Sequence, residues 1–219
     1  RSRRINVDAA VHVAGLAAAA AVPFVFTSTD LVFDGRRPPY RETDPPAPVS
    51  VYGGQKMAAE RGIRSHCPDA LICRMPLMFG DPGPSGASFI QPWISALGES
   101  RQLRLFTDEF RTPVSGRTAA AGLLLALEKG GGLLHLGGRT RISRYEFGTI
   151  LAELLGADTA LIRPVRQADV ATAAPRPPDV SLDSRKAYAL GYDPPPLRED
   201  LRQVLDVLGA GCSGPHPSG

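Results

Sequence analysis

A tyrosine and a lysine stand four residues apart at the start of a stretch that predicts a helix. Tyr52 and Lys56 would therefore lie on one helix face, within reach of a shared ligand. A phenol has a pKa of about 10, and a cation about 4 Å away at an effective dielectric near 20 stabilises the phenolate by about 4 kcal/mol. The pair could therefore act as a general acid or base, although two exposed helix residues would show the same spacing.

A hydroxyl group follows the first short apolar run. Residues 24–27 predict a strand buried on both faces, as in a parallel sheet covered by helices. Thr29 comes at the carboxyl end of this strand, where open α/β sheets bind their ligands. Its hydroxyl could hold a substrate carbonyl, although alone it would more simply turn or cap the chain. Only the combination of Thr29, Tyr52 and Lys56 favours an active site.

The elements that would position these side chains alternate between helix and strand. In chain order the pattern predicts an Ala-rich helix over 7–21 capped by Asn6, a strand over 24–27, a loop over 35–48, a helix over 51–66 and a strand over 70–73. This order is typical of parallel strand connections.

Beyond Gly80 the pattern becomes less regular, and this shift is the best candidate for a boundary. Further elements are expected as helices over 89–97, 115–129, 143–155 and 197–208 and a strand over 103–106. We expect 1–80 to be the sheet-based part, 81–208 to be mainly a substrate-binding lobe with some return to the sheet, and 209–219 to be a disordered tail.

Composition indicates a soluble globular protein that acts on small molecules. Of the 219 residues, 43% are hydrophobic and 21% are charged, and the net charge of +3 comes from scattered rather than clustered basic residues. This distribution argues against a nucleic-acid partner. Gly15 and Pro23 interrupt the Ala-rich stretch, which argues against a membrane span or a signal peptide.

The cysteines argue against a zinc site and a disulfide framework. There are three, Cys67, Cys73 and Cys212, at irregular spacing. An odd, low count suits a reducing compartment. We therefore expect a cytoplasmic location, with organellar targeting left open because the first residue is Arg1 rather than Met.

Longer runs resemble one known family. Residues 26–35, with the sequence FTSTDLVFDG, and 52–56, with the sequence YGGQK, together with Glu60, closely resemble the dTDP-4-dehydrorhamnose reductases. These enzymes belong to the extended short-chain dehydrogenase/reductase superfamily. The weaker matches are Pro39, Tyr40, Glu42, Asp44, Pro48, Arg74, Phe79, Gly80, 111–113, 174–177 and 181–183.

The resemblance implies a fold, a cofactor and a role for each matching residue. The fold would be an α/β, Rossmann-like, doubly wound parallel sheet, truncated at its amino end, with a small C-terminal α/β substrate-binding lobe. Thr29 would bind the carbonyl, Tyr52 would donate or accept the proton, and Lys56 would hold the nicotinamide ribose of NADPH or NADH. Arg111 and Arg176 are candidate contacts for the phosphates of a nucleotide sugar, and structural ion pairs would explain them equally well.

The activity that the resemblance implies is the reduction of a nucleotide-linked 4-keto sugar. The alternatives are an epimerase or dehydratase of the same superfamily, or a regulatory subunit that resembles the methionine adenosyltransferase beta subunit. The sequence names neither the sugar nor the nucleotide, does not choose between NADH and NADPH, and leaves the oligomeric state open, with a homodimer among the states it allows.

One departure from the family concerns the cofactor site. The family begins with a Gly-rich turn that binds the cofactor pyrophosphate, and nothing before Thr29 resembles it. The Ala-rich helix corresponds to the family's fourth helix. We therefore expect that about the first third of a complete enzyme is absent, that the strand over 24–27 has an open edge, and that the isolated chain is inactive and binds NAD(P)H weakly.

Overall fold

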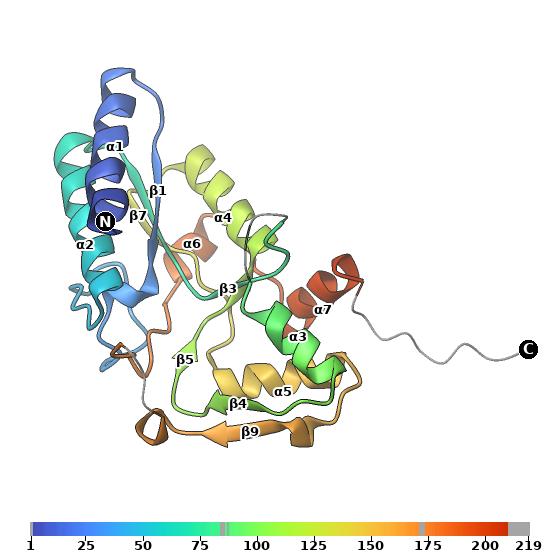
Figure 1. The fold of residues 1–219 in the computed structure, drawn as a ribbon. Helices are drawn as coiled ribbons and strands as arrows, with labels where there is room; N and C mark the ends of the chain where they lie inside the picture. Colours follow the sequence, from blue (N-terminus) through green and yellow to red (C-terminus); the bar gives the residue numbers. More distant parts are fainter. Residues whose placement is uncertain (1, 84–85, 87, 171–173, 210–219) are drawn as a thin grey trace, which may run out of the picture.

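A three-stranded parallel sheet forms the centre of one half of the molecule (Figure 1). The computed structural model describes residues 2–83, 86, 88–170 and 174–209. The strand order is β1 (Val25–Thr29), β2 (Leu71–Met75) and β7 (Leu133–His135), so β1 lies at one edge. Thr29 pairs with Met75 in register, and both strands end at the same level.

Helices cover both faces of this sheet (Figure 1). On one face, α1 (Ala10–Ala19) and α2 (Val51–His66) pack on Phe26 and Ile72 of the sheet, and small side chains such as Ala14 let the helices lie close. On the other face, α4 (Gly116–Lys129) and α6 (Arg185–Ala189) pack on Cys73 and Met75. Residues 72 and 73 point to opposite faces because side chains alternate along a strand.

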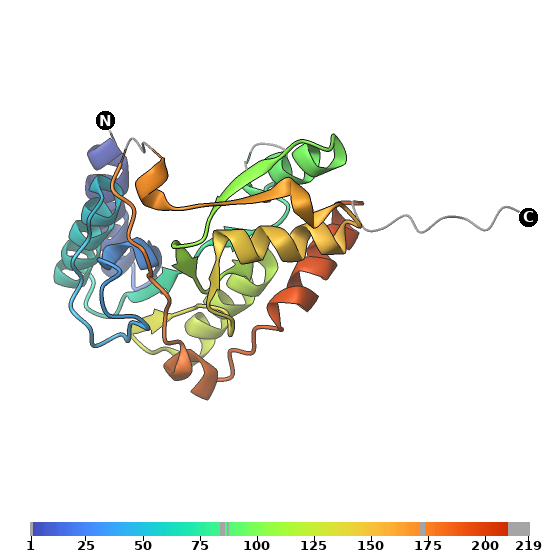
Figure 2. The same ribbon diagram turned by 90° about the horizontal axis from the view of Figure 1, so that it is seen from below.

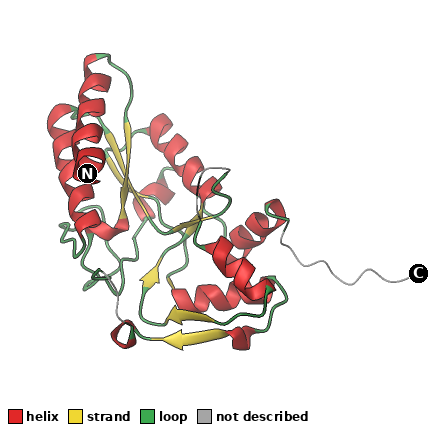
Figure 3. Ribbon diagram, in the orientation of Figure 1, coloured by secondary structure: helices red, strands yellow, loops and turns green. Residues whose placement is uncertain are grey.

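The second half has its own apolar core, built around Phe147 (Figures 2 and 3). Its helices are α3 (Ile90–Gly98), α5 (Arg144–Leu154) and α7 (Leu197–Val207). Its strands form three pairs, which are parallel β3 (Met78–Phe79) with β6 (Val114–Ser115), parallel β4 (Leu103–Phe106) with β9 (Ile162–Val165), and antiparallel β5 (Phe110–Arg111) with β8 (Ile142–Ser143). The remaining elements among the described residues are four short helical turns, which are η1 (Arg4–Ala9), η2 (Asp30–Val32), η3 (Thr159–Leu161) and η4 (Gln167–Asp169).

The long elements agree with the sequence-based expectations. Helix α2 and strand β4 have the predicted bounds, and the helices predicted after residue 80 differ by one residue, at one end in α4 and α7 and at both ends in α3 and α5. Strand β7 lies within the range expected to be mainly lobe and pairs with β2, so the chain returns to the sheet there. The tail expected over 209–219 lies outside the described residues apart from Gly209.

The start of the first helix differs from its prediction. The π-helical turn η1 contains Asn6, so Asn6 is not a cap. Its side-chain amide instead donates a hydrogen bond to Oε1 of Gln55 on α2, at 2.7 Å. A tertiary contact of this kind cannot be read from local sequence. Among the described helices, none is long and apolar enough to cross a membrane.

Buried polar groups connect α2 to the sheet. The Glu60 carboxylate takes two hydrogen bonds from the Arg74 guanidinium, at 3.0 and 2.8 Å, and one from the Ser28 hydroxyl. Arg74 Nη1 also lies 3.4 Å from His135 Nε2, and His135 Nδ1 lies 3.0 Å from the Tyr40 carbonyl oxygen. The imidazole therefore fits as a neutral ring that donates at Nδ1 and accepts at Nε2.

We expect His135 to make folding sensitive to acid. Burial, and secondarily the Arg74 charge, lower the pKa of His135 to about 3. The unfolded chain, with a His pKa near 6.5, binds the proton first as the pH falls, so stability is full above about pH 6.5 and is lost toward pH 3, by on the order of 4 kcal/mol.

Urea unfolding between pH 7 and pH 4 measures this effect. His135→Gln should flatten the pH dependence of the unfolding free energy, whereas His12→Gln, at an exposed site, should leave it as in the wild type. Equal slopes in all three proteins would show that His135 is not the titrating group.

Candidate functional site

The carboxyl end of β1 carries the first candidate residue. Thr29 is buried, and its Oγ1 accepts a hydrogen bond from the Leu31 amide at 3.2 Å and donates one to Asp30 Oδ1 at 3.2 Å. The hydroxyl therefore caps η2, as the simpler sequence interpretation proposed, while it remains at the end of the strand. The orientation of this hydroxyl depends on its hydrogen bond to Asp30.

Helix α2 begins directly against this strand end. Ser50 caps the helix by accepting a hydrogen bond from the Gly53 amide at 3.1 Å. A Cβ atom on Gly53 would lie only 2.1 Å from the Leu31 carbonyl oxygen, so glycine is required for this approach. The contact sets the position of Tyr52, one residue earlier, relative to Thr29.

Lys56 points back toward β1. Its ammonium donates a hydrogen bond to the Thr27 carbonyl oxygen at 2.7 Å and lies 4.5 Å from the centre of the Phe26 ring. The same nitrogen is 6.0 Å from the centre of the Tyr52 ring. Burial lowers the pKa of Lys56, and the Glu60 carboxylate partly opposes this shift.

The electrostatic environment of Tyr52 differs from the sequence-based expectation. We expected Lys56 to lower the pKa of this phenol, but the pKa of Tyr52 is raised, first by burial and second by the negative charge of Asp30. The expectation was wrong because the Lys56 ammonium is held at the Thr27 carbonyl, 6.0 Å from the centre of the Tyr52 ring, while the buried Asp30 carboxylate opposes ionisation of the phenol. A phenol with a raised pKa keeps its proton at neutral pH but is a weaker acid, so proton transfer from it needs a nearby positive charge that stabilises the phenolate.

A cleft of about 340 Å³ opens beside Tyr52. Arg111 and Arg176 line it together with Tyr52, whereas Thr29 and Lys56 are not part of its wall. The full lining is Leu31, Ser50, Tyr52, Glu109, Arg111 and 174–177. The other described hollows, of about 350 to 480 Å³, contain none of the five predicted residues.

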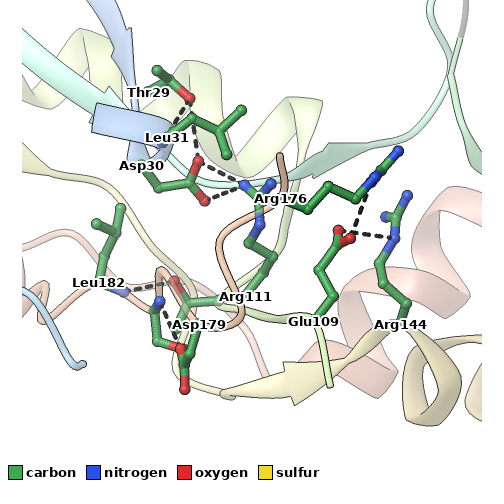
Figure 4. Close-up of polar contacts among 11 residues, drawn as sticks. Thr29, Asp30, Leu31, Glu109, Arg111, Arg144, Arg176, Asp179 and Leu182 are labelled. Carbon is green, nitrogen blue, oxygen red and sulfur yellow. Dashed lines mark hydrogen bonds and ion pairs between the residues drawn. The ribbon is translucent and has the colours of Figure 1, made fainter. Parts of the chain in front are cut away.

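Two carboxylates and three guanidinium groups meet at this cleft (Figure 4). Arg111 Nη1 contacts both oxygens of Asp30, at 2.7 and 2.6 Å. The buried Glu109 pairs with Arg176 Nη1 at 3.0 Å and with Arg144 Nε at 3.7 Å. The excess of positive charge favours an anionic ligand.

Sequence reasoning missed Asp30, Glu109 and Arg144 as parts of this site. Burial and the nearby Arg111 and Arg176 charges lower the pKa of Arg144 to about 10, against an opposing effect of Glu109. The sequence did contain a weak indication for Glu109. It stands two residues before Arg111, and in an extended chain residues two apart point to the same side. Arg144, at the start of α5, had none.

Lys56 is the described residue best suited to a cofactor ribose. An ammonium has three donors, and the Thr27 carbonyl is its only acceptor within the described part of the chain. Among the same residues, no cluster of three His, Cys, Asp or Glu side chains could hold a metal ion.

Comparison with known proteins identifies the family. The family model for the RmlD substrate binding domain matches residues 1–209. The chain belongs to the RmlD substrate binding domain family. Its relatives include the "Probable low-salt glycan biosynthesis reductase" of Haloferax volcanii, 35% identical over 82% of this chain and 62% of the relative. The methionine adenosyltransferase 2 subunit beta of Xenopus laevis is 29% identical over 92% of this chain and 62% of the relative.

Solved structures confirm the fold of this RmlD-family chain. A dTDP-4-dehydrorhamnose reductase from Clostridium acetobutylicum superimposes with a TM-score of 0.87 at 27% identity and covers 94% of this chain and 73% of its own. The Bacillus anthracis enzyme, crystallised with NADP, gives a TM-score of 0.86 at 22% identity, with 94% and 74% covered. The predicted family and the Rossmann-like α/β fold are therefore confirmed. The chain spans 62% of the length of the two curated relatives named above.

The two adjacent glycines of α2 provide a test of the site geometry. Gly53→Ala should destabilise the protein and displace Tyr52, because the new methyl group collides with the Leu31 carbonyl. Gly54→Ala is the matched control, since nothing lies within 4 Å of its Cβ position, and alanine should stabilise the helix by up to about 1 kcal/mol. Thermal unfolding of both variants measures the difference, and equal melting temperatures would contradict the close contact.

Proposed function

We propose that the protein uses NADPH or NADH to reduce the keto group of a nucleotide-linked sugar, with a dTDP-linked 4-keto sugar as the specific substrate class. The observation that carries the proposal is Tyr52, a phenol held in its protonated form at the wall of a cationic cleft. The names of the relatives support it, since one is a glycan biosynthesis reductase and several neighbours are dTDP-4-dehydrorhamnose reductases.

Each candidate residue has a defined task in this reaction. The bound dinucleotide would supply the hydride. Thr29 would orient the carbonyl oxygen, and Tyr52 would donate its proton to that oxygen as negative charge develops. Lys56 would direct its two remaining N–H donors to ribose hydroxyls while its hydrogen bond to the Thr27 carbonyl holds the ammonium in place. Arg176, half exposed at the cleft, would bind a phosphate of the substrate.

Three other functions occur on the same fold. Sugar-nucleotide epimerases and dehydratases are among the structural neighbours, and methionine adenosyltransferase beta subunits are among the relatives. Tyr52 could serve reduction or oxidation, because the group that donates a proton in one direction accepts it in the other, and the relatives and neighbours named as reductases favour reduction. A non-catalytic subunit would need no such proton donor.

Loss of the phenolic proton should abolish turnover. In a full-length version of the protein, Tyr52→Phe retains the ring but removes the donor, so we expect at least a 100-fold lower kcat with nearly unchanged NADPH affinity. Lys56→Ala should weaken both NADPH binding and turnover, because the ribose contact and the nearby charge are lost together. NADPH oxidation with a panel of nucleotide-linked keto sugars, and calorimetry for NADPH, measure the two quantities. A Tyr52→Phe enzyme with more than a tenth of wild-type turnover would exclude the acid role.

Removal of the phosphate contact should act on substrate binding. Arg176→Ala should raise KM several-fold more than it lowers kcat, because a phosphate lies far from the reacting carbon and is bound equally in ground and transition states. Arg139→Ala is the matched control, since this side chain is also 46% exposed and also paired with a carboxylate, that of Asp193, but lies outside the cleft. An equal loss of kcat with unchanged KM in Arg176→Ala would contradict the phosphate role.

A further inference from the structure

A buried ion pair joins the end of β1 to strand β5, 81 residues further along the chain (Figure 4). The Asp30 side chain is 1% exposed and the Arg111 side chain is 11% exposed. Nitrogen Nη1 of Arg111 lies 2.7 Å from Oδ1 and 2.6 Å from Oδ2 of Asp30. Nη1 of Arg111 is therefore engaged by Asp30, as Nη1 of Arg176 is by Glu109, but the Arg176 side chain is 46% exposed and is the more accessible of the two to a ligand in the cleft.

Burying such a pair brings little net stability. Removing two charges from water costs several kcal/mol each, and their mutual attraction roughly offsets this cost. Burial raises the pKa of Asp30, and Arg111 is the main influence that opposes the rise. The pair is therefore better explained by what the charged Asp30 does at its position than by its contribution to folding.

Asp30 acts on two of the proposed catalytic residues. It accepts the hydrogen bond of the Thr29 hydroxyl at 3.2 Å, so a substrate carbonyl must compete with Asp30 for that hydrogen bond. Its negative charge also raises the pKa of Tyr52. Both the ability of Thr29 to donate and the ability of Tyr52 to keep its proton therefore depend on the state of Asp30.

We propose that Arg111 is a positioning residue that acts through Asp30, holding this carboxylate in its charged form against Thr29 and Tyr52, and that it does not bind the substrate phosphate. This inference rests on the proposed reduction for its kinetic consequences. It assigns Asp30 a role in the site and leaves Arg176 as the phosphate contact of the cleft.

A double-mutant cycle separates this role from direct phosphate binding. Arg111→Met should lower kcat about 10-fold or more, with a smaller change in KM, and Arg111→Lys should recover part of the loss. In an Asp30→Asn background, the further change Arg111→Met should alter kcat/KM by less than about 3-fold, because the partner through which it acts is gone.

A direct phosphate contact would instead give the same increase in KM in both backgrounds, and this result would overturn the proposal. The comparison within the Asp30→Asn background remains decisive if Arg111→Met alone fails to fold.

The pH profile provides a second kinetic readout. The charged and titratable groups around the pair are Tyr52 on α2, Glu109 next to β5, Arg144 on α5 and Arg176. Loss of Arg111 removes the interaction that lowers the pKa of Asp30, so the acid limb of kcat/KM should move to higher pH in Arg111→Met. The limb should be absent in the Asp30→Asn/Arg111→Met double variant. An unshifted limb in Arg111→Met would overturn the proposal.

Tyrosinate absorbance tests the link without any turnover. The difference between a protein and its Tyr52→Phe variant isolates the ionisation of Tyr52, and Asp30→Asn should lower the pKa of that phenol. Asp193→Asn, at an aspartate 84% exposed and outside the cleft, should not. An unchanged titration in Asp30→Asn would overturn the inference whatever the substrate is. A lowered pKa in a protein that reduces no keto sugar would support the action of Asp30 on Tyr52 and overturn the proposed reduction alone.

Discussion

The buried ion pair between Glu60 and Arg74 fixes the helix that carries Tyr52 to the sheet. Glu60 stands one helical turn after Lys56, and its carboxylate meets Arg74 of β2 and Ser28 of β1, while Arg74 reaches His135 of β7. One network therefore connects α2 with all three strands. Because an uncompensated buried charge costs several kcal/mol, α2 cannot slide or rotate without breaking it. The spacing of Thr29, Tyr52 and Lys56 is a consequence of this constraint.

A second set of buried charges determines what these residues can do. Asp30 lies where it influences both Thr29 and Tyr52, and Arg111, from the other half of the molecule, opposes the effect of burial on its pKa. The protonation state of Asp30 at the end of β1 thus depends on Arg111 of β5. Any movement of one half of the molecule relative to the other would change the distance between these two charges. Because the Asp30 and Arg111 side chains are 1% and 11% exposed, their mutual interaction is screened less than that of the same charges in water.

Sequence patterns predicted the long helices and strands and singled out Thr29, Tyr52 and Lys56 as candidates. They failed to predict the features that depend on contacts between residues far apart in the chain. The bounds of α2 follow from the Ser50 cap and helical spacing, both local features. Strands β5 and β8 have two residues each and exist only because they pair, so no periodicity could indicate them. The direction of the Tyr52 pKa shift was wrong for the same reason, since it depends on Asp30 and on the hydrogen bond of Lys56 to β1.

The balance of charge around Tyr52 sets how easily this phenol can exchange its proton. A nearby cation lowers the pKa of a phenol and a nearby carboxylate raises it. In this site the Lys56 ammonium donates to the Thr27 carbonyl and lies 6.0 Å from the centre of the Tyr52 ring, while Asp30 opposes ionisation of the phenol. A ligand that drew the ammonium away from Thr27 and closer to Tyr52 would lower the cost of forming the phenolate without removing Asp30. Because the same phenol gives up the proton in reduction and takes it up in oxidation, this electrostatic adjustment would act on both directions of the reaction.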